Sequence, residues 1–258
     1  MILVKLGGSV ITDKAKLRTF KRSSCDRLAK ELSSVNAPLA IVHGAGSFGH
    51  IEAKKHSLHK GFRTKSQLHH VAAVQRDVRE LNLRVLASLI DNSVRAVSVP
   101  PASAAKFRGG MIRKFEPDTF GQMFDLGLTP VSFGDVVPDE SMGFSICSGD
   151  LMMEAIAKAF RPKLVVFCAD VDGVYDSDPK RNKKARLIPE LDSSKLAGLK
   201  RTESANADVT GSIYGKVERM LAIAQYCEKC MIVNGNVPGR LGKAVSGREV
   251  ASTVVVPG

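Results

Sequence analysis

The sequence begins with Met1-Ile-Leu-Val-Lys-Leu-Gly-Gly-Ser-Val-Ile-Thr-Asp-Lys14, and this stretch decides the fold. Residues 2–6 predict a strand, but Lys5 interrupts its apolar run. A strand buried on both faces would require an anion beside Lys5. An edge strand would instead let the side chain extend to water. Both interpretations are open for Lys5 alone. The glycines after it favour the anion, because a tight glycine turn presents backbone N–H groups to a phosphate.

A second glycine loop follows the next predicted strand, residues 39–42. It reads His43-Gly-Ala-Gly-Ser-Phe-Gly-His50 and matches the G-x-G-x-x-G pattern of dinucleotide-binding proteins. The acidic residue expected about 20 positions later is missing, since residues 62–67 read FRTKSQ. Two glycine loops at the ends of parallel strands would face each other across the carboxyl edge of the sheet, where those strands end. Two phosphorylated groups can meet there.

The rest of the chain alternates between predicted helices and strands, which is typical of an α/β protein. Apolar residues at three- and four-residue steps predict a long helix over residues 68–90. Further helices are expected at 24–32, 115–126, 151–160 and 193–199 and up to about residue 228, and further strands at 94–99, 129–133, 163–169, 230–234 and 252–256. We expect a single domain.

Three later segments add candidate anion sites. Ser148-Gly149-Asp150 opens a helix, and either Ser148 or Asp150 is placed to cap it. Residues 208–216 combine a glycine turn, Lys216 and a helix start; they are not a Walker A loop, because only three residues separate the glycines. The acidic run 170–178 lacks the later glutamate and the flanking helices of a calcium loop.

Two further residues near the loops have both a functional and an ordinary interpretation. His50 is placed to donate to a phosphate, or it is a common helix-start histidine. Lys14 either folds back over whatever the first glycine turn binds, or faces solvent.

Composition restricts the class of partner. The 258 residues carry a net charge of +12, but the basic residues are dispersed, and 11 Phe, 3 Tyr and no Trp offer few platforms for base stacking. We therefore expect no nucleic-acid partner, and we expect the charge to steer small polyanions.

No run approaches a membrane span and no leader precedes the first strand, so we expect a cytoplasmic protein without a membrane partner. Five scattered cysteines are expected to be reduced.

The motifs at residues 5–9, 44–50, 148–150, 168–175 and 208–216 resemble those of the amino acid kinase family over the whole length. Within that family the chain resembles the isopentenyl phosphate kinase branch, because a histidine, His50, ends the second glycine loop. The resemblance implies a three-layer αβα sandwich with a mostly parallel open sheet. It also implies one domain over residues 1–258, with an acceptor lobe at about 1–160, a nucleotide lobe at about 161–258 and a homodimeric assembly.

The same resemblance implies transfer of the γ-phosphoryl group of ATP to isopentenyl phosphate, giving isopentenyl diphosphate and ADP in an alternative mevalonate route. The implied cofactors are ATP and Mg²⁺, and no residue is assigned as a metal ligand. The residues that the resemblance implies are, for ATP, Lys5, Gly7, Gly8, Ser9, Gly46, Asp170, Tyr175, Gly211 and Lys216; for the acceptor, Ala45, Gly46, Gly49, His50 and Gly149; and for catalysis, Lys5, Lys14, His50 and Asp150.

The pattern departs from the family at two positions, because Ser212 stands where a second glycine is expected and Ala45 where some relatives carry glycine. Two alternatives remain open. One is a kinase of the same fold that acts on another phosphate or phosphonate, such as fosfomycin. The other is a non-catalytic protein of this fold that binds nucleotide, which the retention of Lys5, Lys14 and Lys216 disfavours.

Overall fold

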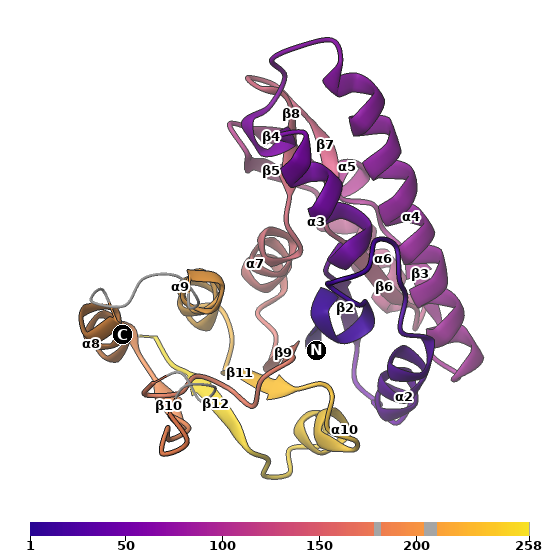
Figure 1. The fold of residues 1–258 in the computed structure, drawn as a ribbon. Coiled ribbons are helices and arrows are strands. Elements are labelled where there is room, and N and C mark those ends of the chain that lie inside the picture. Colours follow the sequence, from indigo (N-terminus) through magenta and orange to yellow (C-terminus); the bar gives the residue numbers. More distant parts are fainter. Residues whose placement is uncertain (178–181, 204–210, 258) are drawn as a thin grey trace.

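The structure is a computed structural model that describes residues 1–177, 182–203 and 211–257. These residues form an eight-stranded sheet in the order β10-β12-β11-β9-β1-β2-β6-β3, with helices on both faces (Figure 1). The strands are β1 Ile2–Leu6, β2 Leu39–His43, β3 Ala96–Ser98, β4 Ala105–Arg108, β5 Met111–Phe115, β6 Thr129–Phe133, β7 Asp135–Asp139, β8 Gly143–Cys147, β9 Leu164–Ala169, β10 Glu190–Leu191, β11 Lys229–Asn234 and β12 Ser252–Val255. The helices are α1 Gly8–Ile11, α2 Arg22–Leu32, α3 Gly46–Lys55, α4 Gln67–Asp91, α5 Pro101–Ala104, α6 Asp118–Asp125, α7 Gly149–Phe160, α8 Ser193–Glu203, α9 Gly211–Ala224 and α10 Arg240–Val245, with the 3-10 helix η1 Leu58–Lys60.

Strand β1 lies in the middle of the sheet, parallel to β2 on one side and to β9 on the other. Lys5 is paired in register with Val42 and Phe167, and its side chain is only 9% exposed. The edge-strand interpretation of Lys5 is therefore wrong. The sheet is parallel except for the pairing of β11 with β12. The first glycine turn, the second glycine loop and the segment after β9 thus leave the sheet at one edge.

Alternate residues of each central strand point into two different cores. Leu3 and Val42 pack with helices α6, α7, α8 and α9 on one face of the sheet. Val4 and Ile41 pack with α2, α4 and α10 on the other face. Burial on both faces explains why these strands read as continuous apolar runs. The expected three-layer αβα sandwich with a mostly parallel open sheet is confirmed.

Two hairpins were not predicted, and one of them corrects a helix. Strands β4 and β5 pair around Gly109 and Gly110, whose φ angles of +62° and +76° suit the two central positions of a tight hairpin turn. The helix expected over 115–126 therefore begins only at Asp118, because Phe115 ends β5. The second hairpin, β7–β8, packs against α4 and η1 through a small apolar cluster that includes Val74, Phe133 and Phe144.

Smaller differences concern element ends. The strand expected at 94–99 is shortened to Ala96–Ser98. Helix α3 begins at Gly46, inside the second glycine loop, so His50 lies in its second turn. Helix α10 and strand β10 were not predicted.

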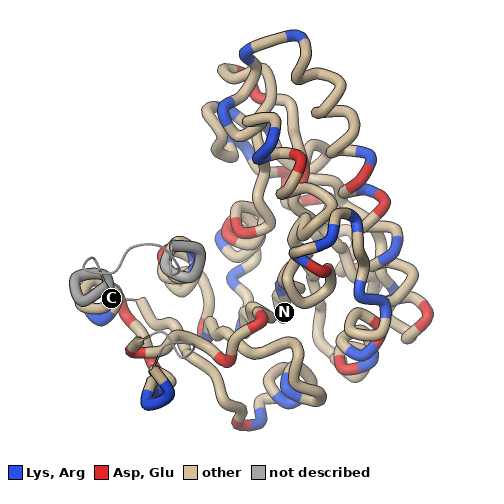
Figure 2. Tube along the Cα trace, in the orientation of Figure 1, with Lys and Arg blue, Asp and Glu red and all other residues tan. Residues whose placement is uncertain are grey.

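Charge is spread over the surface of the molecule. Lys and Arg residues occur along nearly the whole chain trace and do not gather on one side (Figure 2). In the described part of the chain, no helix combines the length and apolar composition that a membrane crossing requires.

Candidate active site

A cleft of about 630 Å³ opens at the edge of the sheet where β1, β2 and β9 end. Its size is in the range of small-molecule binding sites. The lining residues come from β1, both glycine segments, the segment after α1, α3, α7, β9 and α9. They are Lys5, Gly7, Gly8, Ser9, Lys14, Gly44, Gly46, Ser47, His50, Ile51, Lys54, Asp150, Phe167, Cys168, Ala169 and Lys216.

The two glycine loops contact each other at the base of this cleft. A Cβ atom added to Gly8 would lie 2.7 Å from the backbone N and Cα atoms of Gly46, so the two backbones approach as closely as glycine allows. Thr12 joins the loops, because its hydroxyl donates to the Gly8 carbonyl at 2.6 Å and accepts from the Ser47 N–H at 3.1 Å. The loops face each other as the strand pattern predicted.

The anion beside the buried Lys5 is Asp150, whose carboxylate accepts a hydrogen bond from the lysine ammonium. Asp150 lies in the first turn of α7, and the N-cap is Ser148, whose hydroxyl accepts from the Leu151 N–H at 3.2 Å. The capping interpretation of Asp150 is therefore wrong. Because Ser148 caps the helix, Asp150 is available to Lys5, and a Lys–Asp pair stands at the floor of the cleft.

A second Lys–Asp pair, Lys14 and Asp170, lies beside the cleft; Lys14 lines the cleft, whereas Asp170 follows the end of β9 and is not among the lining residues. Asp170 accepts hydrogen bonds from the Ser9 hydroxyl at 2.9 Å and from the Lys14 ammonium at 3.3 Å. Burial raises the pKa of Asp170, but the Ser9 hydrogen bond and the Lys14 charge outweigh burial, and the pKa lies below its ordinary value. The side chain of Lys14 is 66% exposed, so solvent weakens its ion pair with Asp170.

A third lysine, Lys216, projects from α9 into the same cleft. Burial, followed by the positive charge of Lys5, lowers the pKa of Lys216, while Asp150 and Asp170 oppose the shift. Four lysines, Lys5, Lys14, Lys54 and Lys216, therefore line the cleft against one lining carboxylate, Asp150, with Asp170 beside it, and the site has a surplus of positive charge. Such a site suits a polyanion, whose phosphates would relieve the mutual repulsion of the lysines.

A smaller pocket of about 80 Å³ adjoins the cleft beyond Lys5 and His50. Its mouth is polar and its wall is largely apolar, with Ala45, Ala53, Val74, Val78, Val136 and Ile146 among the lining residues. Gly49 and Gly149 also line it. This pocket lies between α3, α4 and the β7–β8 hairpin, so the hairpin that sequence reasoning missed forms part of the site.

His50 stands at the boundary between the cleft and the smaller pocket, because it lines both. Burial, followed by the charges of Lys5 and Lys14, lowers the pKa of His50. The imidazole is therefore neutral at pH 7, and it can donate one hydrogen bond without carrying charge. Asp135 lines the same pocket; burial raises the pKa of Asp135 to about 6, although Arg79 lies 3.3 Å away.

A buried hydrogen-bond chain holds the second glycine loop, and sequence reasoning did not find it. His43 is fully buried, and burial lowers the pKa of His43 to about 4, so the ring is neutral. Its Nδ1 donates to the Gly44 carbonyl at 3.1 Å, which leaves Nε2 to accept from Asn82 at 3.1 Å. Ser98 in turn donates to Asn82 at 2.6 Å. The loop is thereby fixed to α4 and β3.

The structure leaves some expected residues away from the cleft. Tyr175 does not line it; its hydroxyl donates to Asp172 at 3.3 Å, and Asp172 also pairs with Arg240. Gly211 begins α9, whereas residues 208–210 of the same expected loop lie outside the described residues. Lys54 and Phe167 line the cleft without having been expected. The spacing of Lys54, one helical turn after His50, is the signal that could have found it.

A mostly parallel α/β sheet with paired glycine loops and a lysine cluster at one edge defines a phosphate-binding protein. Residues 1–234 match the Amino acid kinase family, and the chain belongs to this family.

Two isopentenyl phosphate kinases are similar to this chain over nearly the full length of both proteins. The chain is 36% identical to the isopentenyl phosphate kinase of Thermoplasma acidophilum, over 94% of this chain and 95% of that protein. It is 34% identical to the isopentenyl phosphate kinase of Methanothermobacter thermautotrophicus, over 98% of both chains. A solved isopentenyl phosphate kinase structure aligns with a TM-score of 0.86 at 31% identity, over 99% of this chain and 100% of that one. UMP kinase from Ureaplasma parvum, at 14% identity and a TM-score of 0.67, shares the fold.

Proposed function

We propose that this protein is an ATP-dependent kinase that phosphorylates isopentenyl phosphate, giving isopentenyl diphosphate and ADP. The observation that carries the proposal is the small apolar pocket beside His50, which opens directly onto the lysine-lined cleft. A phosphate would lie at the polar mouth, and a short apolar chain would lie against Val74 and Val78. The similar isopentenyl phosphate kinases, which match over nearly their full length, support the same substrate.

The proposed roles divide along the cleft. Lys5, Gly7, Gly8, Ser9, Gly46 and Lys216 would hold the phosphates of ATP, with Asp170 and the start of α9 at Gly211 nearby. Ala45, Gly46, Gly49, His50 and Gly149 would surround the acceptor. We infer an acceptor lobe at about 1–160 and a nucleotide lobe at about 161–258. Tyr175 is assigned no contact with ATP, because its hydroxyl is engaged with Asp172 outside the cleft.

The chemistry is in-line transfer between two anions. An oxygen of the acceptor phosphate attacks the γ-phosphorus of ATP, and the bond from that phosphorus to the β-phosphate oxygen breaks, leaving ADP. The attacking oxygen is already ionised, so no general base is needed. The task of the protein is to hold two polyanions in contact, which the lysines and loop N–H groups do by preorganised electrostatics.

Two features refine this mechanism. Lys14 is exposed and only weakly paired with Asp170, so its ammonium would stabilise the negative charge that develops on the phosphoryl group during transfer. His50 is neutral, so it suits a hydrogen bond to the acceptor phosphate; the cationic charge there comes from Lys5. The Lys5–Asp150 pair keeps a buried ammonium at the junction of both substrates.

Mg²⁺ fits this site as a companion of ATP. Asp150, which lines the cleft, and Asp170, which lies beside it, are both engaged with lysines, so they do not form a closed cage of oxygen ligands. Mg²⁺ ordinarily binds through substrate phosphates, water and one or two carboxylates. Asp170, whose side chain is 40% exposed, is the carboxylate we assign to the ion or its waters. When bound, Mg²⁺ would neutralise charge on the phosphates of ATP.

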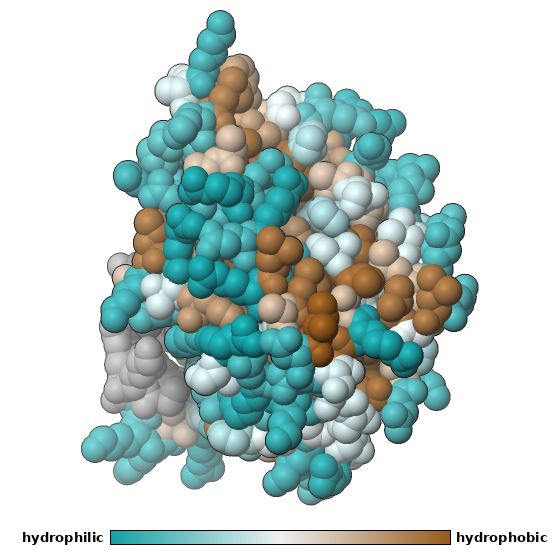
Figure 3. All heavy atoms as spheres, turned by 90° about the vertical axis from the view of Figure 1, so that its right-hand side faces the viewer, coloured by the Kyte–Doolittle hydropathy of each residue, from teal (hydrophilic) through white to brown (hydrophobic). Residues whose placement is uncertain are grey.

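We also propose a homodimer in the cytoplasm. Apolar side chains gather on the face that Figure 3 shows, and on α4 both Leu83 and Ile90 are more than half exposed. Such a face suits burial against a second copy. The five cysteines are free, which suits a reducing compartment.

An acceptor panel tests the proposed reaction. ADP release is followed with Mg-ATP and, in turn, isopentenyl phosphate, fosfomycin, UMP, glutamate and aspartate. Isopentenyl phosphate is expected to give the highest kcat/KM. Faster turnover of glutamate, aspartate or UMP would overturn the proposal. Faster turnover of fosfomycin would show instead that the protein is a kinase of this fold whose acceptor is a phosphonate.

A further inference from the structure

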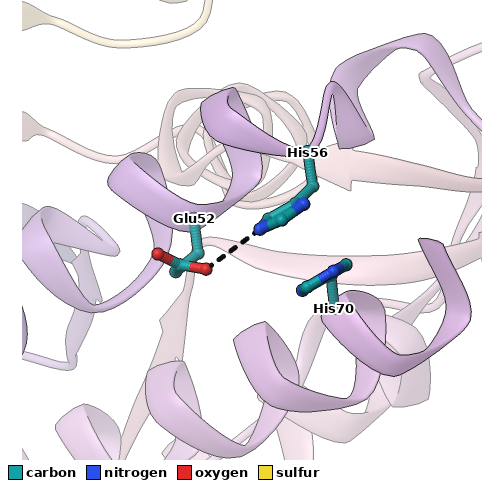
Figure 4. A group of neighbouring side chains, drawn as sticks. All are labelled: Glu52, His56 and His70. Carbon is teal, nitrogen blue, oxygen red and sulfur yellow. Dashed lines mark ion pairs between the residues drawn. The ribbon is translucent and has the colours of Figure 1, made fainter. Parts of the chain in front are cut away.

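A cluster of three potential metal ligands lies outside the cleft, between α3 and α4. Glu52 and His56 are four residues apart on α3, so they share one face of that helix. His70, in the first turn of α4, completes the group from the facing helix. The three side chains converge in the space between the two helices (Figure 4). All three are partly buried, so an ion can enter from solvent.

The geometry brings one donor atom of each residue together. These atoms all lie within 4.8 Å of one another, and the Oε2 atom of Glu52 is 3.3 Å from the Nε2 atom of His56. The imidazole rings of His56 and His70 are stacked, with centroids 3.3 Å apart and planes 10° apart. Donor atoms around a tetrahedral zinc ion, with bonds of about 2.0–2.2 Å, are separated by roughly 3.3–3.6 Å. Side-chain rotations that move the donor atoms by about 1.5 Å or less would therefore bring them to that separation.

The His56 nitrogen that lies nearest to Glu52 has an unusual environment. The Nε2 atom of His56 is shielded from solvent and forms no hydrogen bond with any described residue. A shielded nitrogen that lies 3.3 Å from a carboxylate oxygen and yet forms no hydrogen bond calls for an explanation. A cation held between the Glu52 carboxylate and the two imidazoles would give this nitrogen a partner.

We propose that Glu52, His56 and His70 bind a divalent transition-metal ion, for which zinc is the best match, and that the ion joins α3 to α4. Two imidazoles and one carboxylate form a common three-ligand set for zinc, with water in the fourth position. Mg²⁺ prefers oxygen ligands, so the ion that accompanies ATP would not compete well here.

An ion at this position would connect two walls of the small apolar pocket. Helix α3 carries Ala53 and α4 carries Val74, and both residues line the small apolar pocket. An ion held by both helices would restrain the two walls of that pocket against each other. The site lies outside the cleft residues, so this inference stands whether or not isopentenyl phosphate is the acceptor.

Zinc binding to untagged, chelator-treated protein tests the proposal by calorimetry and thermal unfolding. The Cys227→Ser variant serves as the background, because Cys227 and Cys230 form the other set of soft ligands that zinc could take. One ion per chain is expected to bind, and Tm is expected to rise by about 5 °C when free zinc is a hundredfold above Kd. Cobalt should give visible absorption without a thiolate charge-transfer band, since the ligands are nitrogen and oxygen.

Two variants and one matched control locate the site. His70→Gln and Glu52→Gln should each weaken zinc binding by on the order of a hundredfold, because each removes one of three ligands. His69→Gln removes an exposed neighbouring imidazole outside the group and should bind zinc as the background does. Far-UV circular dichroism and Tm without metal would show whether each variant folds. Absence of saturable binding in the background protein, or unchanged binding in folded His70→Gln, would overturn the proposal.

Discussion

At the residue scale, the site depends on side chains that carry charge into a partly buried cleft. Lys5 lies in a central strand and needs Asp150, which is 145 residues away in the chain. The sequence predicted the need for an anion from the interrupted apolar run. It could not identify the partner, because a contact between distant residues depends on how the sheet and α7 are assembled.

Loss of the Asp150 charge should destabilise the fold. Asp150→Asn keeps the shape of the side chain but leaves the Lys5 ammonium buried without its anion. A charge-assisted hydrogen bond contributes about 1.5–3 kcal/mol, so Tm should fall by about 3–6 °C. Asp125→Asn, the same change at an exposed residue, should stay within about 0.5 kcal/mol of the parent. Equal Tm values for the two variants would show that Lys5 does not depend on Asp150.

Lys14 should affect the transition state more than substrate binding. It is 66% exposed and only loosely tied to Asp170, so little ground-state binding energy depends on it. Lys14→Ala is expected to lower kcat by about 10²–10³ and to change either KM far less, as in the loss of an oxyanion-hole donor. Steady-state kinetics with both substrates varied would measure this. A loss confined to the KM for ATP would instead place Lys14 in nucleotide binding.

His50 should select the acceptor through a neutral hydrogen bond. His50→Ala is expected to reduce kcat/KM for isopentenyl phosphate by roughly ten- to a hundredfold, and the KM for ATP should change little. Because the pKa of His50 is lowered, the ring is uncharged at pH 7 and above. His50→Gln, a neutral donor, should therefore keep most of the activity at pH 7–8. If the Ala variant had normal acceptor kinetics, His50 would be an ordinary residue of α3.

At the scale of elements, the cleft is formed by loops that leave parallel strands at one edge. Their positions were predictable, since each glycine segment follows a clear apolar strand. The hairpins β4–β5 and β7–β8 were not, although Gly109-Gly110 is a hairpin-turn signal in the sequence. That signal alone did not decide against a helix, because the strands of both hairpins have only four or five residues, too few for their periodicity to distinguish them from the neighbouring helices. The β7–β8 hairpin closes the apolar pocket, and that pocket therefore could not be foreseen.

The close contact between the two glycine loops gives a prediction at this scale. In Gly8→Ala the new Cβ would meet the backbone of Gly46 at 2.7 Å, and backbone cannot move aside as a side-chain tip can. The loops should separate, and ATP binding measured by calorimetry should weaken markedly while the protein stays folded.

Gly121→Ala is the matched control for this change. It adds the same methyl group in α6, where no atom lies within 4 Å. Alanine is the better helix residue, so stability should rise by about 0.5–1 kcal/mol with unchanged ATP binding. Equal ATP affinity in both variants would mean that the loop contact does not shape the phosphate site.

At the scale of the whole molecule, the sheet brings an apolar pocket and a cationic cleft to one edge. Alternating helices and strands predicted an α/β protein, because elements of this length have distinct apolar periods. The resemblance of the motifs implied the three αβα layers, and the order of strands and glycine loops predicted that the two loops would meet. The Glu52–His56–His70 cluster could not be foreseen, since its residues become neighbours only when α3 and α4 pack.

The central claim is that the acceptor is a phosphate with a short apolar chain. We would incubate the protein with limiting Mg-ATP and an equimolar mixture of isopentenyl phosphate and UMP, and identify the products by ³¹P NMR. The account predicts ADP and isopentenyl diphosphate as the dominant products, with UMP left almost unchanged. Conversion of UMP to UDP with isopentenyl phosphate left intact would contradict it.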